Sequence, residues 1–163
     1  EGGPFAKTTL TDWRRIMATN LDGVFMTLQS AMATLPADMP VRMIVISSIA
    51  GVRGLEGASA YTVSKHGTIG LIRALSEEYM RSAITFNAVC PGYVDTDIVR
   101  RQVAGVMRRM DTDEAGARAV FAKGNRHNRL LEVDETTATI MWLCADGARS
   151  INGQTIQISG GQI

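Results

Sequence analysis

Tyr61 and Lys65 are the two residues whose types and spacing best suit catalysis in this sequence. They lie four positions apart in a helical segment, and an α-helix places such residues on one face. A tyrosine phenol is a poor base at neutral pH, but a nearby cation favours its charged form. The pair could therefore exchange a proton with a carbonyl or alcohol oxygen. The alternative is an ordinary helix face, because this spacing also occurs by chance.

Ser48 follows residues 43–46, an apolar run with the length and composition of a buried strand. A hydroxyl at the carboxyl end of a parallel strand points into the crevice where such sheets bind ligands. There it can hydrogen-bond a substrate oxygen. A serine in this place also commonly caps the following loop, and that interpretation stays open.

Asn20 and Gly23 lie inside the amphipathic helix that apolar spacing predicts over residues 13–35, with Thr11 as its expected cap. Both residues are unfavourable in a helix interior, so together they predict a local kink with a purpose. The alternative is a surface asparagine on a tolerant helix.

A second buried strand is predicted over residues 84–89, and it leads through Cys90 into the turn-forming pair Pro91-Gly92. Such a turn at a strand's carboxyl end exposes backbone groups, and the Thr96 hydroxyl, to the same crevice. The simpler interpretation is a turn that only ends the strand.

The remaining pattern predicts a helix over residues 59–81, a broken helix over 96–123, a helix from 133 and a last strand at 156–158. Helices that alternate with buried strands are typical of a parallel sheet covered on its faces by helices. We therefore expect an α/β fold, in a single domain over residues 1–163.

The composition fits a soluble globular protein, with 45% hydrophobic and 20% charged residues. A net charge of +1 provides no field for nucleic acid, and no apolar run is long enough to span a membrane. The two cysteines, Cys90 and Cys144, lie in apolar stretches, so we expect buried, reduced thiols and a cytoplasmic location. No metal site is predicted, since the sequence has only two histidines.

The order of these residues resembles the catalytic half of the short-chain dehydrogenases/reductases. The residues that carry the resemblance are Asn20, Ser48, Tyr61, Lys65, Pro91, Gly92 and Thr96, followed by Gly153-Gln154 and Ser159-Gly160-Gly161. The resemblance covers essentially the whole chain. It implies a Rossmann-like, doubly wound parallel sheet, of which this chain forms the C-terminal portion.

The resemblance also implies a role for each catalytic residue. Tyr61 would be the general acid/base, and Ser48 would orient the substrate oxygen. Lys65 would favour the phenolate and bind the nicotinamide ribose, while Asn20 would hold a water in a proton relay. The implied reaction is hydride transfer between NAD or NADP and a ketone or secondary alcohol, as in a ketoreductase.

The implied cofactor-binding residues are Tyr61, Lys65, Pro91, Gly92, Val94 and Thr96, with Val94 and Thr96 at the nicotinamide carboxamide. The segment at about 97–130 would form a lid over a small-molecule carbonyl or alcohol substrate. Members of the family commonly pair the two long helices, so a homodimer or homotetramer is expected, with neither a nucleic-acid nor a membrane partner.

The sequence departs from the family pattern in two ways. Val45 occupies a position where the family often has asparagine. No G-x-x-x-G-x-G turn precedes Thr11, and the first residue is Glu1 rather than Met. We expect a longer enzyme whose glycine-rich, N-terminal part precedes Glu1. The alternative is a non-catalytic fragment or scaffold that associates through its long helices. The choice between NAD and NADP stays open.

Arginines are concentrated in the expected lid, at Arg100, Arg101, Arg108 and Arg109, with Arg126 and Arg129 beyond them. Arginine suits bidentate binding of carboxylate or phosphate, so an anionic substrate is one hypothesis. The other is a solvated face whose arginines pair with Asp111, Asp113 and Glu114.

Overall fold

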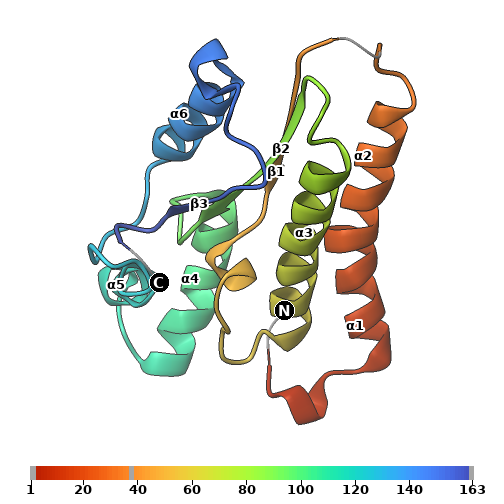
Figure 1. The fold of residues 1–163 in the computed structure, drawn as a ribbon. Coiled ribbons are helices and arrows are strands. Elements are labelled where there is room, and N and C mark those ends of the chain that lie inside the picture. The colour runs from red at the N-terminus through yellow and green to blue at the C-terminus, as the bar shows by residue number, and fades with distance from the viewer. Residues whose placement is uncertain (1–2, 37–38, 162–163) are drawn as a thin grey trace.

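The computed structural model describes residues 3–36 and 39–161 (Figure 1). Its sheet has the parallel order β1-β2-β3, with strands β1 Val41–Ile46, β2 Ile84–Pro91 and β3 Thr155–Ile158. Strand β1 pairs with β2 from Val41↔Ile84 to Ile46↔Val89, and β2 pairs with β3 from Ala88↔Thr155 to Pro91↔Ile158. The carboxyl ends of the strands therefore lie at one edge of the sheet.

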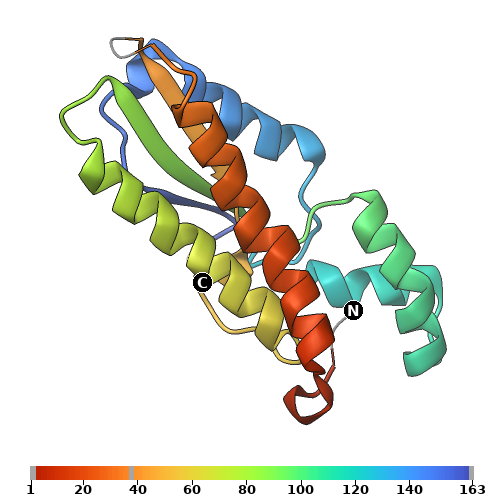
Figure 2. The same cartoon turned by 90° about the vertical axis from the view of Figure 1, so that its right-hand side faces the viewer.

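Helices cover both faces of this sheet, as Figure 2 shows. Their bounds are α1 Leu10–Met17, α2 Gly23–Met32, α3 Ser59–Glu78, α4 Asp97–Met110, α5 Glu114–Ala122 and α6 Val133–Cys144. Helices α2 and α3 pack on one face, while α6 contacts β1 and β2 from the other. The predicted α/β, Rossmann-like arrangement is confirmed. No helix within the described ranges is long and apolar enough to cross a membrane.

The core lies between the sheet and helix α3. Alternate residues of β2, including Phe86 and Ala88, face the same side as Ile69 and Ile72 of α3. All eight residues of β2 are buried, because helices cover both faces of this central strand. Most residues of the strand are apolar, and its two polar side chains are buried with them.

The N-terminal helix changes its hydrogen-bonding pattern around Asn20, where the sequence predicted a kink. Residues Ala18–Asp22 form a π-helical turn between α1 and α2, and such turns are frequent at functional sites. The prediction of Thr11 as the cap was wrong. Thr9 has the extended backbone of a cap, and its side chain accepts a hydrogen bond from the Asp12 N–H at 3.0 Å. Thr11 already lies in the first helical turn.

The segment after β2 forms two helices, which confirms the predicted broken helix. Asp111, with a left-handed φ of 48°, ends α4, and Asp113 caps α5 through the Gly116 N–H. In Figure 1 both helices lie beyond the carboxyl end of β2.

The cysteine prediction holds in part. Both thiols are free and Cys90 is buried, but Cys144 is exposed. It lies at the end of α6, whose outer face also exposes Met141 and Trp142. The apolar stretch around Cys144 therefore did not indicate that its thiol is buried.

Candidate active site

Helix α3 is attached to the carboxyl end of β1 by two hydrogen bonds that involve Lys65. The Lys65 Nζ donates to the Ile46 carbonyl at 3.0 Å, and the Ser47 hydroxyl donates to the Lys65 carbonyl at 3.1 Å. The same Nζ lies 5.8 Å from the centre of the Tyr61 ring. The structure thus brings Tyr61 and Lys65 together on one helix face, where β1 ends and Ser48 follows.

The loop after β1 passes very close to α3 at Gly51. A Cβ on this residue would lie 2.6 Å from the Ser47 Oγ and 2.9 Å from the Lys65 carbonyl oxygen. Glycine therefore allows the approach that holds Ser48 beside the helix. The Ser48 Oγ accepts a hydrogen bond from the Ala50 N–H at 3.1 Å, so this serine does cap the following turn. A hydroxyl that accepts one bond can still donate its own proton to a substrate.

Burial controls the electrostatics at Lys65. It lowers the pKa of the Lys65 ammonium, because charge is less well solvated away from water. Burial also raises the pKa of the neighbouring Cys90 thiol, against the weaker opposing effects of the Ser48 N–H and the Ser47 hydroxyl. A partly desolvated ammonium is less screened by water, so its charge acts more strongly on nearby groups.

Asn20 reaches α3 through a residue that the sequence did not single out. Its side-chain amide donates to the Ser64 Oγ at 3.1 Å, and Ser64 in turn donates to the Tyr61 carbonyl at 2.7 Å. The Thr68 hydroxyl donates to the Asn20 carbonyl at 3.4 Å. Ser64 and Thr68 are fully buried. The available signal was the series of small residues at four-residue steps in α3, beginning at Ala60, which permits close helix contact.

The predicted cofactor contacts follow β2, the strand next to β1. Pro91 is buried at the strand end, and the Gly92 N–H donates to the Ile158 carbonyl at 2.8 Å. Val94 forms a parallel bridge with Leu131, and Thr96 is the residue before α4. Since β1 and β2 are paired neighbours, these residues lie at the same edge of the sheet as Ser48.

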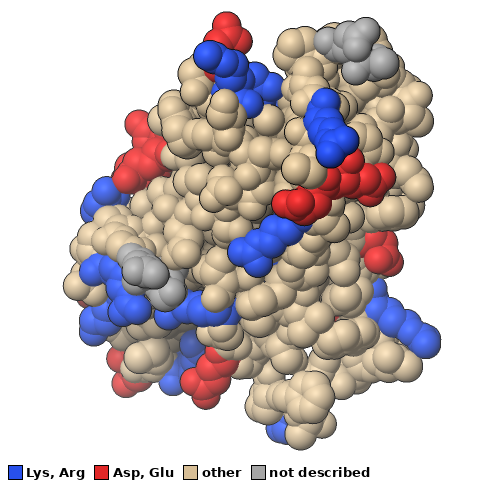
Figure 3. Space-filling model, viewed as in Figure 1, with Lys and Arg blue, Asp and Glu red and all other residues tan. Residues whose placement is uncertain are grey.

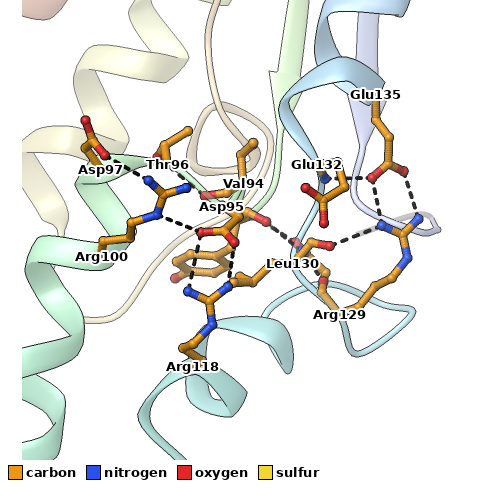
Figure 4. A network of polar contacts seen from close by, with 12 residues as sticks. Val94, Asp95, Thr96, Asp97, Arg100, Arg118, Arg129, Leu130, Glu132 and Glu135 are labelled. Carbon is orange, nitrogen blue, oxygen red and sulfur yellow. Dashed lines mark hydrogen bonds and ion pairs between the residues drawn. The ribbon is translucent and has the colours of Figure 1, made fainter. Parts of the chain in front are cut away.

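An ion-pair network begins within this loop, at Asp95, and a second ion pair lies at the start of α6 (Figure 4). The Asp95 carboxylate binds Arg118 at 2.5 Å and Arg100 at 3.4 Å, and the Arg118 guanidinium lowers the pKa of Asp95. Arg129 donates to both oxygens of Glu135, at 2.7 and 2.8 Å, and lowers the pKa of this carboxyl to about 2.

The arginines of the expected lid are therefore partly paired, although not as predicted. Arg100 binds Asp95 and Asp97, and Arg129 binds Glu135. The predicted partners Asp111, Asp113 and Glu114 make none of the ion pairs found among the described residues. Figure 3 shows basic and acidic side chains interleaved over α4 and α5. Residues 97–130 nevertheless contain eight Lys or Arg against four Asp or Glu, so this region keeps an excess of positive charge.

A polar groove of about 560 Å³ lies between α3 and β3. Its lining includes His66, Arg73, Gln154 and Gln157, together with Gly51 of the loop after β1. None of the predicted catalytic residues lines this groove. It is therefore separate from the candidate site at the strand ends.

Comparison with known proteins assigns the family. Residues 1–162 match the family model described as enoyl-(acyl carrier protein) reductase. The chain is 33% identical over 150 residues to the D-beta-hydroxybutyrate dehydrogenase of Rhizobium meliloti (strain 1021), covering 91% of the chain and 58% of that protein. The chain belongs to the short-chain dehydrogenase/reductase family. This short-chain dehydrogenase/reductase also resembles a putative ketoacyl reductase of the monensin polyketide synthase from Streptomyces virginiae. The two are 33% identical, and the match covers 98% of this chain and 62% of the relative.

Solved structures support the same family. The actinorhodin polyketide ketoreductase, in a crystal structure with NADPH, superposes with a TM-score of 0.89 at 30% identity, over 98% of this chain and 62% of that one. Levodione reductase superposes with a TM-score of 0.87 at 28% identity, over 99% of this chain and 62% of that one. This short-chain dehydrogenase/reductase chain thus spans about three-fifths of the length of the relatives that it matches.

Proposed function

We propose that the protein carrying this chain is an NAD(P)-dependent oxidoreductase that interconverts a ketone and a secondary alcohol, with Tyr61 as its general acid/base. The attachment of Tyr61 and Lys65 to the carboxyl end of β1 is the observation that carries the proposal. The names of the relatives support it, because ketoreductases and a hydroxybutyrate dehydrogenase act on such oxygens.

Each proposed role follows from where the residue lies relative to the carboxyl ends of the strands. During reduction the Tyr61 hydroxyl donates a proton to the carbonyl oxygen, and the resulting phenolate is stabilised by the Lys65 ammonium. Ser48 donates a hydrogen bond to the same substrate oxygen and so fixes its distance from Tyr61. Asn20 lies in the π-helical turn that binds α3 through Ser64, and we propose that it takes part in proton exchange with solvent.

The residues fit the nicotinamide-ribose end of a dinucleotide. An ammonium has three donor hydrogens, and Lys65 gives one to Ile46, which leaves two for ribose hydroxyls. The loop from Pro91 to Thr96 supplies backbone groups and a hydroxyl at the same edge. The bound nicotinamide supplies the hydride, while the protein positions both reactants and manages the proton.

Helices α4 and α5 are the proposed substrate lid. They follow the loop that carries Val94 and Thr96, and they lie beyond the strand ends where the substrate would bind (Figure 1). Segments that close over a substrate exclude water and complete the site.

The decisive experiment replaces Tyr61 by phenylalanine in the full-length protein. Loss of general acid/base catalysis is expected to lower kcat/KM for ketone reduction by ~10²–10⁴-fold. The far-ultraviolet circular dichroism spectrum and NAD(P)H binding should be retained. The matched control is Tyr79→Phe, which removes the same hydroxyl at the other end of α3 and should leave kcat/KM unchanged. Near wild-type turnover of Tyr61→Phe would refute the assignment, and absence of turnover in the wild type would favour the scaffold alternative.

We also propose that the protein forms a homodimer or homotetramer through α2 and α3. The exposed side chains of these helices include Phe25, Met26 and Val63, which are 46%, 55% and 43% exposed, and Met80, just beyond the end of α3, is 64% exposed. Contact between two copies would bury this apolar surface around a symmetry axis. Light scattering at micromolar concentration should give at least twice the protomer mass, and Met26→Glu should lower it. A monomeric wild type would contradict the proposal.

A further inference from the structure

The loop that connects β2 to α4 lacks a strand partner at Tyr93 and is held instead by residues 125–131. The Tyr93 N–H donates to the Asn125 Oδ1 at 2.9 Å, and the Tyr93 carbonyl accepts from the Asn125 Nδ2 at 2.9 Å. The Leu131 N–H also donates to the Tyr93 carbonyl at 2.9 Å, and the Asp95 N–H donates to the Leu131 carbonyl at 2.8 Å. A single side chain therefore binds both polar groups of the Tyr93 backbone.

The side chain of Asn125 has the hydrogen-bonding groups that these contacts require. It is 1% exposed, and its Nδ2 makes a second hydrogen bond, to the Arg129 carbonyl at 2.7 Å. Its carboxamide offers one acceptor oxygen and two donor hydrogens, and all three functions are used here. Aspartate, of the same shape, would place a carboxylate against two carbonyl oxygens. The site therefore requires an amide and not merely a polar residue.

Gly92 shows how closely the loop and the carboxamide fit. A Cβ on Gly92 would collide with the Asn125 Oδ1 and lie 3.4 Å from the Ser159 Cβ. The Gly92 N–H is itself bound to the Ile158 carbonyl of β3. The backbone before Val94 is thus held between the edge strand and Asn125, and it has little room to shift.

We propose that Asn125 is a positioning residue that sets the place of the nicotinamide through the Tyr93–Val94 backbone. This inference rests on the proposed function, in which the loop from Pro91 to Thr96 meets the nicotinamide end of the cofactor. Asn125 acts through Val94 and touches neither cofactor nor substrate. Its loss should weaken binding of the nicotinamide half of a dinucleotide and leave the adenosine half unaffected.

The chain offers a matched control in Asn87. This asparagine is also 1% exposed, and its carboxamide also bridges two backbone groups. Its Nδ2 donates to the Ile151 carbonyl at 2.8 Å, and its Oδ1 accepts from the Gln154 N–H at 3.0 Å. It lies within β2 and holds the segment that precedes β3, away from the loop at Tyr93. A general effect of removing a buried amide should appear equally at both asparagines.

The test compares Asn125→Asp, Asn125→Ser and Asn87→Asp in the full-length protein. Dissociation constants are measured for NADH and NADPH, and for ADP-ribose and its 2′-phosphate, which lack nicotinamide. We expect the Asn125 variants to weaken binding of the preferred dinucleotide by about tenfold, equivalent to ~1.4 kcal/mol, while ADP-ribose binding changes less than twofold. Asn87→Asp should leave the ratio of the two affinities unchanged.

Three results would overturn the inference. Equal weakening of dinucleotide and ADP-ribose by the Asn125 variants would show a general structural role, and so would unfolding of both variants by circular dichroism. Wild-type affinity for the dinucleotide in a folded Asn125 variant would show no role. Failure of the wild type to bind any dinucleotide is a separate result, because it removes the proposed function itself.

Discussion

The sheet and the α4–α5 pair are held in place by different kinds of contact. The sheet core joins residues from four elements, namely α2, β1, α3 and β2. The core of the α4–α5 pair consists of Val99, Val103, Val106, Ala117 and Phe121, which all belong to those two helices. Contacts that link this pair to the rest of the molecule include the side chains of Tyr93 and Leu130, the Asp95 ion pairs and the hydrogen bonds of Asn125.

This difference predicts which parts of the proposed enzyme are rigid and which are mobile. Tyr61, Lys65 and Ser48 are positioned by elements that share one large core, so their geometry depends on the cooperative stability of the whole sheet. We expect helices α4 and α5 to move as a unit more readily than the sheet, because their apolar residues pack mainly on each other and few contacts join them to the sheet. Segments with few apolar contacts to the rest of a protein open most readily.

Two phenylalanines give the strongest test of this comparison. Phe86 packs against Tyr79 in the sheet core, and Phe121 packs against Tyr93 at the α4–α5 pair, both with ring centres 5.6 Å apart. Phe86→Ala should lower the free energy of unfolding by about 3–5 kcal/mol. Phe121→Ala should cost about half of that or less, because its smaller cluster can collapse into the cavity.

Urea unfolding measures the loss of unfolding free energy for the whole chain, and amide hydrogen exchange shows where each variant opens. Exchange in Phe121→Ala should accelerate in α4 and α5 while β2 stays protected. Equal acceleration throughout the chain would show that the two regions are one cooperative unit.

Asp95→Asn tests the same comparison by weakening only polar contacts between the α4–α5 pair and the loop after β2. It removes the charge that binds both Arg100 and Arg118, while the apolar cluster of α4 and α5 is untouched. We expect a two- to fivefold rise in KM for the ketone, roughly the effect of a partly exposed ion pair, with kcat little changed. The control is Asp97→Asn, whose 72%-exposed side chain binds Arg100 only and should leave KM unchanged. A fall in kcat alone would contradict a lid role.

The smallest expected effect concerns the pH dependence of stability at Glu135. Arg129 lowers the pKa of this carboxyl from 4.5 to about 2, so the folded state binds its proton less readily than the unfolded state. The stabilising contribution is therefore complete above pH 4.5 and is lost as the pH falls towards about 2.

Thermal unfolding of wild type and Glu135→Gln between pH 3 and pH 7 measures this contribution. The difference in melting temperature should be largest at pH 7 and should shrink below about pH 4.5. A constant difference across this range would exclude the ion pair as its cause.

The sequence by itself determined the secondary structure and the centre of the candidate site. The apolar run at residues 43–46 predicted β1, because a buried parallel strand needs such residues on both faces, and the mainly apolar residues 84–89 predicted β2. The four-residue spacing of Tyr61 and Lys65 placed them on one helix face, because helix geometry is local. Asn20 and Gly23 predicted an interruption for the same reason, although not its π-helical form.

Only the tertiary structure decided which distant groups meet. Asn125 binds the backbone of Tyr93, 32 residues away, and Asn20 binds Ser64, 44 residues away. The partners of Arg100 and Arg129, and the exposure of Cys144, likewise depend on how whole helices pack. Residue type shows that a buried amide or a cation needs a partner, but the folded chain selects that partner, because it alone brings remote backbone groups within hydrogen-bonding distance.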